Sequence, residues 1–429
     1  MKFYIYNLGC KVKSYESSIM KENLLSNGFV LGDEGNSDIY IINTCTVTNT
    51  SDNKSLKTIR RALRQEGKIV VACGCMTQVN SVYLKNLNVS IILGNKGKSK
   101  ISTYIKEYIK NQKQIIDITD FKDEKFEDMC LLNFDKTRAF VKIEDGCENF
   151  CSYCIIPYAR GKVRSKNPEL VITEVKKLIK EGHKEIVLTG IHTGHYGTDI
   201  NYDFSKLLNQ LVKIKGLERL RISSIEITEI TDGVLDVFKN NSNLVAHFHI
   251  PLQSGSNTIL KLMNRKYDKN YFIDKIKKIK AIRKDVSITT DVIVGFPSET
   301  EELFLESLDT IKKIGFSKVH VFPFSPRKNT KAFEMPNLVD DITKKQRVKK
   351  LIDLSNNLEK DYMNRFIQNI VTVLPETFNQ GYLIGHTGNY LKVRVKADRK
   401  FLNKFIKVKI ISNEYPYLEG QLVSECVLN

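Results

Sequence analysis

The sequence predicts an α/β protein in three parts. These are an N-terminal parallel α/β domain (1–121), a central partial (βα)6 barrel (129–365) and a small C-terminal β-barrel (366–429). Three observations predict this class. Short β-rich runs alternate with helix-like stretches through the first two parts, which is typical of parallel sheets. A charged stretch at 122–128 indicates a linker. Near the end, the pattern changes to basic, glycine-punctuated β-rich runs, which favours a small barrel.

The elements follow from this alternation. In the first part we expect strands at 3–8, 38–43, 68–72 and 90–94, with helices at 14–27 and 52–65. In the second part we expect strands at 139–144, 185–190, 219–224, 244–250, 288–294 and 318–322, with helices such as 168–180 and 299–314 between them. A charged helix at 339–366 then leads to strands at 371–377 and 390–396. Six βα repeats predict a barrel whose site lies at the carboxyl ends of its strands.

The composition of the chain limits the classes of function it can have. The net charge of +18 indicates either solvated surface lysines or a polyanionic partner such as nucleic acid. No apolar run approaches the roughly 20 residues of a membrane span, so we expect a cytoplasmic protein with no membrane partner. The chain has nine cysteines, an odd number, and its start reads as a strand rather than a signal peptide. Metal ligands are therefore favoured over disulfides.

One cysteine motif carries the strongest signal. Cys147, Cys151 and Cys154 form C-x3-C-x2-C directly after the first predicted barrel strand. A structural zinc site takes four protein ligands, and the nearest further cysteine is Cys130. An iron–sulfur cube held by three thiolates instead leaves one iron open to a substrate or cofactor. We therefore favour an open iron–sulfur cluster, with zinc as the alternative.

A second set of cysteines lies in the first part. Cys10, Cys45 and the pair Cys73 and Cys75 each follow or end a predicted strand, and the carboxyl ends of parallel strands gather at one sheet edge. Three thiolates there would hold a second open cluster, although buried cysteines also serve as small hydrophobic residues. We assign Cys75 as the third ligand and Cys73 to packing, because Gly74 precedes Cys75 as Gly9 precedes Cys10.

These motifs together resemble one family over essentially the whole chain. C-x3-C-x2-C after the first strand of a (βα)6 barrel resembles the radical S-adenosylmethionine superfamily. The wider set resembles its methylthiotransferases: N-L-G-C-K-V, I-N-T-C-T-V-T, C-G-C-M-T-Q, D-G-C-E-N-F-C-S-Y-C-I-I-P-Y-A-R-G, R-I-S-S-I-E, H-I-P-L-Q-S-G-S and T-T-D-V-I-V-G-F-P-S-E-T. The tail G-H-T-G-N-Y-L-K-V-R-V resembles the family's RNA-binding TRAM domain.

The resemblance implies sulfur insertion at an unactivated C–H bond of tRNA. One S-adenosylmethionine bound to the [4Fe-4S] cluster on Cys147, Cys151 and Cys154 would supply a 5′-deoxyadenosyl radical, and another would supply a methyl group. A second [4Fe-4S] cluster, on the N-terminal cysteines, would carry the sulfur. An external electron donor and a sulfur source are implied as partners.

The branch signatures are most similar to the threonylcarbamoyladenosine tRNA methylthiotransferases. Lys11 stands where the ribosomal-protein branch would show proline, and T-G-I-H-T differs from the isopentenyladenosine pattern. Lys13 and Ser298 depart from the family pattern. The alternatives are methylthiolation of isopentenyladenosine or of a ribosomal-protein aspartate. A rival of another class is a zinc-stabilised RNA-binding protein without catalysis.

Contacts to cofactor and RNA complete the predicted site. Strand ends predict cofactor contacts from Thr189, Gly190, Ser223, Ser224, Gln253, Ser254, Val294, Gly295 and Phe296, and the resemblance adds Tyr153 beside the adenine. The predicted RNA-binding residues are Lys54, Lys57, Arg61 and Arg64 on one helix face, and Tyr390, Lys392, Arg394 and Lys396 in the tail. Basic strands with nearby tyrosines suit backbone binding with some base stacking.

Overall fold

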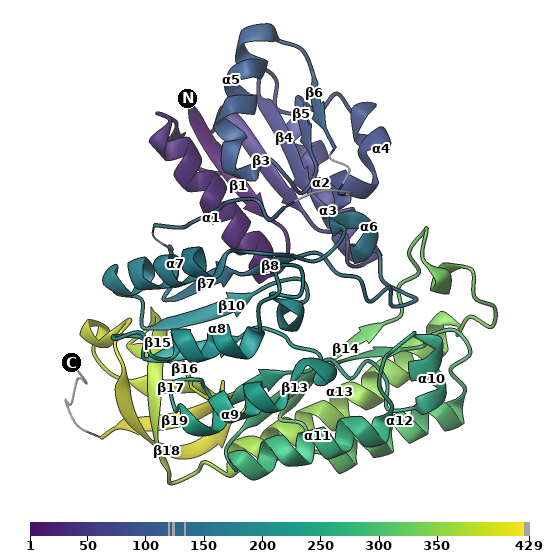
Figure 1. The fold of residues 1–429 in the computed structure, drawn as a ribbon, viewed down its shortest axis with the longest axis vertical. Helices are drawn as coiled ribbons and strands as arrows, with labels where there is room; N and C mark the ends of the chain where they lie inside the picture. The colour runs from purple at the N-terminus through teal and green to yellow at the C-terminus, as the bar shows by residue number, and fades with distance from the viewer. Residues whose placement is uncertain (119–120, 122–124, 133, 424–429) are drawn as a thin grey trace.

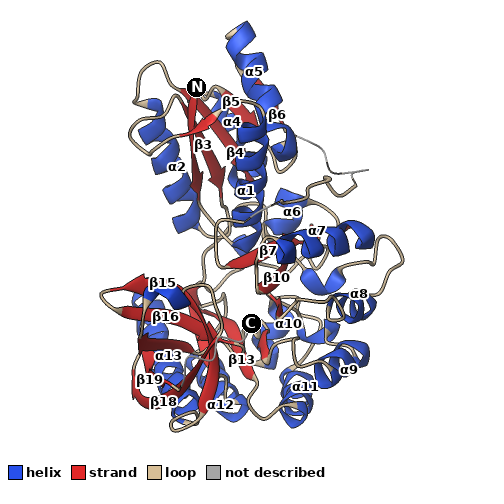
Figure 2. Ribbon diagram, turned by 90° about the vertical axis from the view of Figure 1, so that its left-hand side faces the viewer, coloured by secondary structure: helices blue, strands red, loops and turns tan. Residues whose placement is uncertain are grey.

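The computed structural model describes residues 1–118, 121, 125–132 and 134–423, and it confirms the α/β class (Figure 1). It contains a six-stranded sheet, two three-stranded parallel sheets and a closed five-stranded barrel. Figure 2 shows the closed barrel packed beside the central part, with the six-stranded sheet above them. Of the linker predicted at 122–128, residues 122–124 lie outside the described residues, and 125–128 form neither helix nor strand.

The N-terminal sheet is parallel throughout, in the order β2-β1-β3-β4-β5-β6. Its strands are β1 (Lys2–Asn7), β2 (Val30–Leu31), β3 (Ile39–Thr44), β4 (Ile69–Gly74), β5 (Ile91–Leu93) and β6 (Ile115–Asp117). Its helices are α1 (Lys11–Ser26), α2 (Asn49–Leu63), α3 (Cys75–Val79), α4 (Ser81–Lys85) and α5 (Ile101–Asn111). All four predicted strands are present, whereas edge strands β2 and β6 are too short to show a sequence period.

Helices cover both faces of this sheet. Ile39 and Ile41 pack with residues of α1 and α5, and Tyr40 and Ile42 pack with residues of α2, α3 and α4. Strands β3 and β4 are consequently buried at every position. Burial on both faces explains why these strands appear in the sequence as continuous apolar runs.

Helix α1 joins the first part to the second. Met20 and Leu24 pack on the N-terminal sheet, while Tyr15 and Ile19 belong to the large core of the central part. The Tyr15 hydroxyl donates to Glu174 Oε1 at 2.8 Å, and that carboxylate lies on a helix of the central part. A helix buried on two sides holds its first turn in a fixed position relative to both parts.

The central part is an open barrel of parallel strands. Its strands are β7 (Arg138–Lys142), β10 (Glu185–Thr189), β11 (Arg219–Ile222), β12 (His247–His249), β13 (Ser287–Val294) and β14 (Lys318–Pro323). The sheets β11-β10-β7 and β12-β13-β14 are joined by a single bridge between Leu220 and Leu244. Within the described chain β7 and β14 do not pair, so the barrel is open on that side. All six predicted strands are present, the fourth shorter than expected.

Helices and a small hairpin complete the central part. The helices are α6 (Ile156–Arg160), α7 (Pro168–Lys180), α8 (Phe204–Leu211), α9 (Asp232–Asn240), α10 (Asn257–Leu262), α11 (Lys269–Ile282), α12 (Glu301–Ile314) and α13 (Asp341–Asn364). Strands β8 (Glu144–Asp145) and β9 (Arg164–Ser165) pair with each other on either side of α6. The helices predicted at 168–180, 299–314 and 339–366 correspond to α7, α12 and α13.

The C-terminal part is a closed barrel in the order β15-β16-β17-β19-β18. Its strands are β15 (Ile370–Asn379), β16 (Tyr382–Thr387), β17 (Lys392–Lys396), β18 (Ile406–Glu414) and β19 (Tyr417–Leu422). The strand predicted from residue 390 begins at Lys392 instead, because Tyr390 lies in a turn with φ 68°. In the described part of the chain, no helix is both long and apolar enough to cross a bilayer.

We predict that Tyr15→Phe lowers the free energy of unfolding by about 1–2 kcal/mol, because it removes a buried hydrogen bond to a carboxylate. The exposed Tyr271 provides the matched control, and Tyr271→Phe should leave stability unchanged. Urea unfolding followed by circular dichroism measures both variants. Equal stability of the two variants would show that the Tyr15 hydroxyl does not tie α1 to the central part.

Candidate metal and cofactor site

The structure places the N-terminal cysteines at the carboxyl ends of three neighbouring strands. Cys10 caps α1 after β1, Cys45 directly follows β3, and Cys75 directly follows β4 as the first residue of α3. A Cβ built on Gly9 would lie 3.4 Å from the Cβ of Cys45, so the chain beside Cys10 runs against Cys45. The predicted common edge is therefore present, and thiols from three strand ends gather along it.

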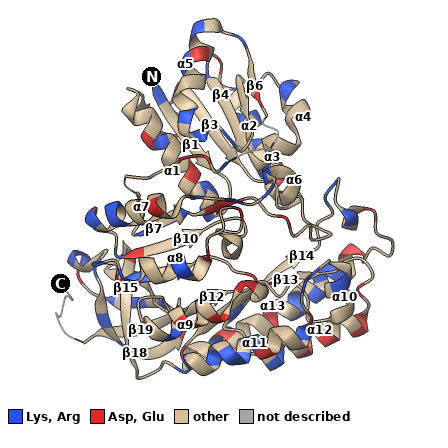
Figure 3. Ribbon diagram, viewed as in Figure 1, with Lys and Arg blue, Asp and Glu red and all other residues tan. Residues whose placement is uncertain are grey.

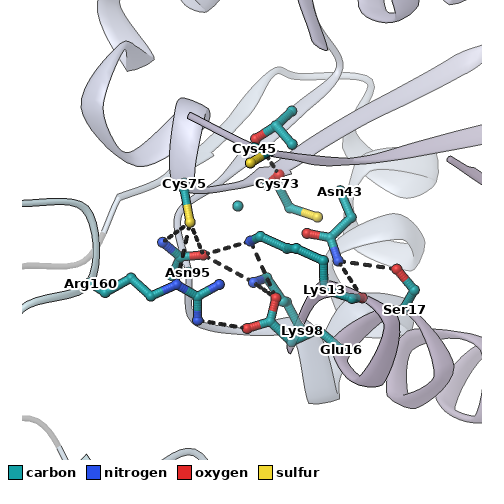
Figure 4. A network of polar contacts seen from close by, with 12 residues as sticks. Lys13, Glu16, Ser17, Asn43, Cys45, Cys73, Cys75, Asn95, Lys98 and Arg160 are labelled. Atoms are coloured by element: carbon teal, nitrogen blue, oxygen red, sulfur yellow. Dashed lines mark hydrogen bonds and ion pairs between the residues drawn. The ribbon is translucent and has the colours of Figure 1, made fainter. Parts of the chain in front are cut away.

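Cys73 and Cys75 have different environments. The Cys73 thiol lies 3.9 Å from Met20 Sδ in the apolar core, and burial raises its pKa to about 11. Burial also raises the pKa of Cys75, but the charges of Arg160, Lys13 and Lys98 outweigh it and lower the value to about 7. Figure 4 shows the two thiols directed to different sides of the strand end. Cys75 therefore has the ionised, electropositive surroundings of a metal ligand.

A buried charge network surrounds Cys75, and Glu16 lies at its centre (Figure 4). Arg160 donates through Nε to Cys75 Sγ at 3.3 Å and through Nη1 to Glu16 at 2.9 Å. The other cations on Glu16 are Lys98 at 2.5 Å, Lys142 at 3.2 Å and Lys13 at 3.3 Å. Asp145 is the second carboxylate, 2.8 Å from Arg160 and 2.6 Å from Lys142.

This network holds more positive than negative charge. Five buried cations, Lys13, Lys98, Lys142, Arg160 and Arg164, face the carboxylates of Glu16 and Asp145, and Arg160 Nη2 has no hydrogen-bond partner among the described residues. Uncompensated buried charge is strongly destabilising. A thiolate-bound iron–sulfur cluster is anionic, so a cluster on Cys10, Cys45 and Cys75 would supply the missing negative charge. The residues present therefore fit such a group.

The second triad lies beyond β8 in the central part. The Cys147 N–H donates to Gly161 O at 3.0 Å, and the Cys154 N–H donates to Cys151 O at 2.9 Å, which fixes the loop. Arg265 Nη1 donates to Cys151 Sγ at 3.3 Å and also pairs with Glu226. Burial and the neighbouring thiols raise the pKa of Cys147. A bound metal would overcome this, because coordination keeps a thiol deprotonated.

Among the described residues, the three thiols of neither triad converge as closely as in a preformed single-zinc site. At Zn–S distances of about 2.3 Å, thiolates on one ion lie within roughly 4 Å of one another. Among the described residues, the side-chain groups that converge within 4.8 Å are His192, His195 and Glu229, and His249, Asp291 and His320. Neither group contains a cysteine.

A chamber of about 590 Å³ connects the site to all three parts of the chain. Cys10 and Lys11 border it from the N-terminal part, and Tyr390 borders it from the C-terminal barrel. Four of the predicted cofactor-contact residues line it, namely Thr189, Gly190, Ser223 and Ser224. His247 and His249, on one face of β12, line it as well. Among the described cysteines, Cys10 is the one that reaches this chamber.

The remaining predicted cofactor residues lie outside the chamber wall. Phe296 is buried and meets Tyr153 edge to face, with ring centroids 6.4 Å apart. Ser254 is buried and bonds Ser307 on α12, and Gly295 donates to Glu299. Gln253, with φ 65°, donates to Asp291 O, and Val294 is buried. These residues support the loop that carries Tyr153 and the ends of β12 and β13.

The predicted RNA-binding residues fall on two surfaces and in one interior position. Lys54, Lys57, Arg61 and Arg64 are all exposed along α2. On β17, Arg394 lies over the Tyr382 and Tyr417 rings, Lys392 lies over Tyr417, and Lys396 is exposed. Tyr390 instead faces the chamber, with Arg138 and Arg221 against its ring. Figure 3 shows lysine and arginine positions spread over all three parts of the chain.

An open parallel barrel with three cysteines beyond its first strand defines a radical S-adenosylmethionine protein. Residues 141–311 match the radical SAM superfamily, and residues 2–94 match uncharacterized protein family UPF0004. The structure resembles TsrM of Kitasatospora setae, a radical S-adenosylmethionine methyltransferase, with a TM-score of 0.56 and 12% identity over 75% of this chain and 72% of that one. At this identity the likeness shows the fold.

Sequence relatives define the family more narrowly. The chain is 43% identical to threonylcarbamoyladenosine tRNA methylthiotransferase MtaB of Bacillus subtilis, covering 97% of this chain and 95% of that protein. It is 37% identical to MtaB of Thermotoga maritima (96% and 95%) and 34% identical to tRNA-2-methylthio-N(6)-dimethylallyladenosine synthase of Natranaerobius thermophilus (99% and 97%). The chain belongs to the radical SAM methylthiotransferase family, in the MtaB branch. Its radical SAM domain implies S-adenosylmethionine and a [4Fe-4S] cluster.

We predict that metal-free protein contains one thiolate that titrates near pH 7, because the pKa of Cys75 is lowered to about 7. Cys75→Ser should abolish this transition, measured as thiolate ultraviolet absorbance against pH. Cys73→Ser is the matched control and should retain it, because the pKa of Cys73 is about 11. Loss of the transition in the Cys73 variant alone would reverse the assignment.

We predict that Glu16→Gln lowers the free energy of unfolding by about 3–5 kcal/mol at neutral pH, because it leaves several buried cations uncompensated. Burial raises the pKa of Glu16, but Arg160, Lys13, Lys98 and Lys142 outweigh it and hold the pKa well below 4.5. The stabilisation is thus complete above about pH 4.5 and decreases as the pH falls further, so the two stabilities should converge in acid.

Urea unfolding as a function of pH measures this effect. Asp274→Asn, in an exposed pair with Lys277, is the control and should show no comparable loss. A Glu16 variant as stable as the wild type at neutral pH would contradict the proposed role of the network.

Proposed function

We propose that this protein methylthiolates C2 of N6-threonylcarbamoyladenosine beside the anticodon of tRNA, using two [4Fe-4S] clusters. The observation that carries the proposal is that Cys10 of the N-terminal triad borders the same chamber as the barrel strand ends. A sulfur-carrying group and a radical-generating group can thus serve one substrate. The curated MtaB relatives, at 37% to 43% identity, act on this nucleoside by name.

In this proposal each part of the chain has one task. Residues 1–121 hold the second cluster on Cys10, Cys45 and Cys75, and residues 129–365 hold the first on Cys147, Cys151 and Cys154. One S-adenosylmethionine would supply the radical that removes hydrogen from adenine C2, and a second would supply the methyl group. Residues 366–429 bind RNA as a TRAM-like barrel.

The chain's own side chains prepare the site. Arg265 places positive charge 3.3 Å from Cys151 Sγ, and Arg160 does the same for Cys75. The hydroxyls of Thr189, Ser223 and Ser224 offer polar contacts to a nucleoside cofactor in the chamber. The rings of Tyr153 and Phe296 pack edge to face beside the triad of Cys147, Cys151 and Cys154.

The exposed basic residues along α2, together with Lys396 at the end of β17, suit the phosphate backbone of tRNA, so we expect the affinity to fall steeply with salt. The chemistry further requires two external partners in the cytoplasm, an electron donor and a source of sulfur, because each turnover removes sulfur from the protein. The dimethylallyladenosine synthases, at 34% identity, make methylthiolation of the isopentenyl nucleoside the second candidate.

We predict that tRNA from cells lacking this protein loses 2-methylthio-threonylcarbamoyladenosine and accumulates the unmodified nucleoside, as measured by nucleoside mass spectrometry. Wild type and Cys73→Ala should restore the product, whereas Cys147→Ala and Cys75→Ala should not. Loss of methylthio-isopentenyladenosine instead would favour the second candidate. An unchanged set of methylthio-adenosines would refute a tRNA substrate.

Metal analysis supplies an independent readout. Protein reconstituted without oxygen should contain about eight irons, and either triad variant about four. One or two zinc ions without labile sulfide would instead support the rival non-catalytic protein.

A further inference from the structure

Of the three lysines that line the chamber, Lys11 is the one with neither a hydrogen bond nor an ion pair from its side chain among the described residues. Of the residues lining the chamber, Lys11, Lys318 and Lys392 are basic and only Glu359 is acidic. Glu359 accepts from Lys318 at 3.0 Å, and Lys392 donates to the Tyr417 hydroxyl at 3.3 Å. No described carboxylate lies within ion-pair distance of Lys11. The lining therefore presents a free cation to whatever the chamber binds.

Two further groups beside the chamber lack hydrogen-bond partners. Arg221 is 99% buried and uses only Nε, which donates to Glu185 at 2.7 Å, so Nη1 and Nη2 have no partner among the described residues. His247 lines the chamber, is 94% buried, and has no described partner for Nδ1. Buried polar groups normally find partners, so unpartnered nitrogens at a cavity indicate a missing ligand.

Tyr390 connects these groups. Its ring meets the His247 ring at a tilt with centroids 4.9 Å apart, and the Arg221 guanidinium lies 4.8 Å from the ring centroid. Arg138 lies 5.3 Å from the same centroid and donates to the hydroxyl at 3.2 Å. Behind this wall Arg138 pairs with Glu376, and Arg221 shares Glu185 with Arg219, which lies on the Phe405 ring. Together with Lys11, these cations exceed the two carboxylates, so the wall suits an anionic ligand.

We propose that Lys11 and the unpartnered Nδ1 of His247, with the charge of Arg221 behind the Tyr390 ring, form a subsite for the carboxylate of the N6-threonylcarbamoyl group. This inference rests on the proposed function and names the contact that selects the substrate. In adenine, the ring nitrogen N1 lies between C2 and C6, the carbon that carries N6. Lys11 directly follows Cys10, so an acid held by Lys11 places C2 beside the edge that would carry the sulfur.

The same wall disfavours a neutral substrate. A dimethylallyl group offers no negative charge, so binding it would bury Lys11 against hydrocarbon without compensation. Selectivity then arises both from the contact made to the acid and from the cost imposed on its apolar rival.

The test compares two anticodon stem–loop RNAs that differ only in the threonyl group, one with the free acid and one with its methyl ester. Binding to reconstituted protein is measured by fluorescence anisotropy. Wild type should bind the acid about tenfold more tightly than the ester, the effect of one charged hydrogen bond. Lys11→Gln should bind the acid about tenfold more weakly and no longer distinguish the two, and Lys11→Arg should restore the preference.

Lys318→Gln is the matched control from the same chamber, and it should keep the wild-type ratio between acid and ester. If Lys11→Gln weakens the binding of both RNAs equally, Lys11 contacts a phosphate and the subsite is refuted. If wild type methylthiolates the acid RNA but binds the ester equally well, the subsite fails while the proposed function stands. If wild type methylthiolates only a dimethylallyl RNA, both fail.

Discussion

Glu16 is the residue on which the arrangement of this site depends. It lies fully buried on α1 and contacts cations from its own helix, from the segment before α5, from β7 and from α6. One carboxylate thus joins the N-terminal sheet to the open barrel. Because those cations exceed the carboxylates nearby, the junction is left electropositive. The same field lowers the pKa of Cys75 and makes the sheet edge suitable for an anionic cluster.

The chamber is a product of this junction. Helix α1 begins at its wall, so the contacts that hold Glu16 and Tyr15 also position Cys10 and Lys11. The barrel is open between β7 and β14, and the other two parts contribute residues to its lumen. Neither the barrel nor the N-terminal sheet alone would enclose the substrate. The site is therefore a property of the assembled chain.

The sequence predicted most of the fold and the position of Cys10, Cys45 and Cys75 at neighbouring strand ends. Strands such as β3 and β4 were found because burial on both faces gives them continuous apolar runs, and strand-end reasoning placed Ser223 and Ser224 at the chamber. The charge network was missed. Lys13 and Glu16 look in sequence like a solvated helical pair, and only tertiary contacts with Lys98 and Arg160 show that they are buried.

Tyr390 shows a second limit of prediction from the sequence. Its basic, β-rich surroundings suggest a surface residue that stacks on RNA, whereas its left-handed backbone turns the ring inward. Such a turn depends on contacts with Arg138 and Arg221, which lie far away in sequence.

Because the Tyr390 ring points inward, the C-terminal barrel also helps to enclose the chamber. A chain shortened before β15 would lose the ring that closes the lumen between Arg138, Arg221 and His247. Bulk water would then enter the chamber in which, on the proposed function, a carbon radical must survive. If residues 366–429 bind RNA as proposed, this barrel both contacts tRNA and closes the chamber, so its removal would waste cofactor as well as weaken tRNA binding.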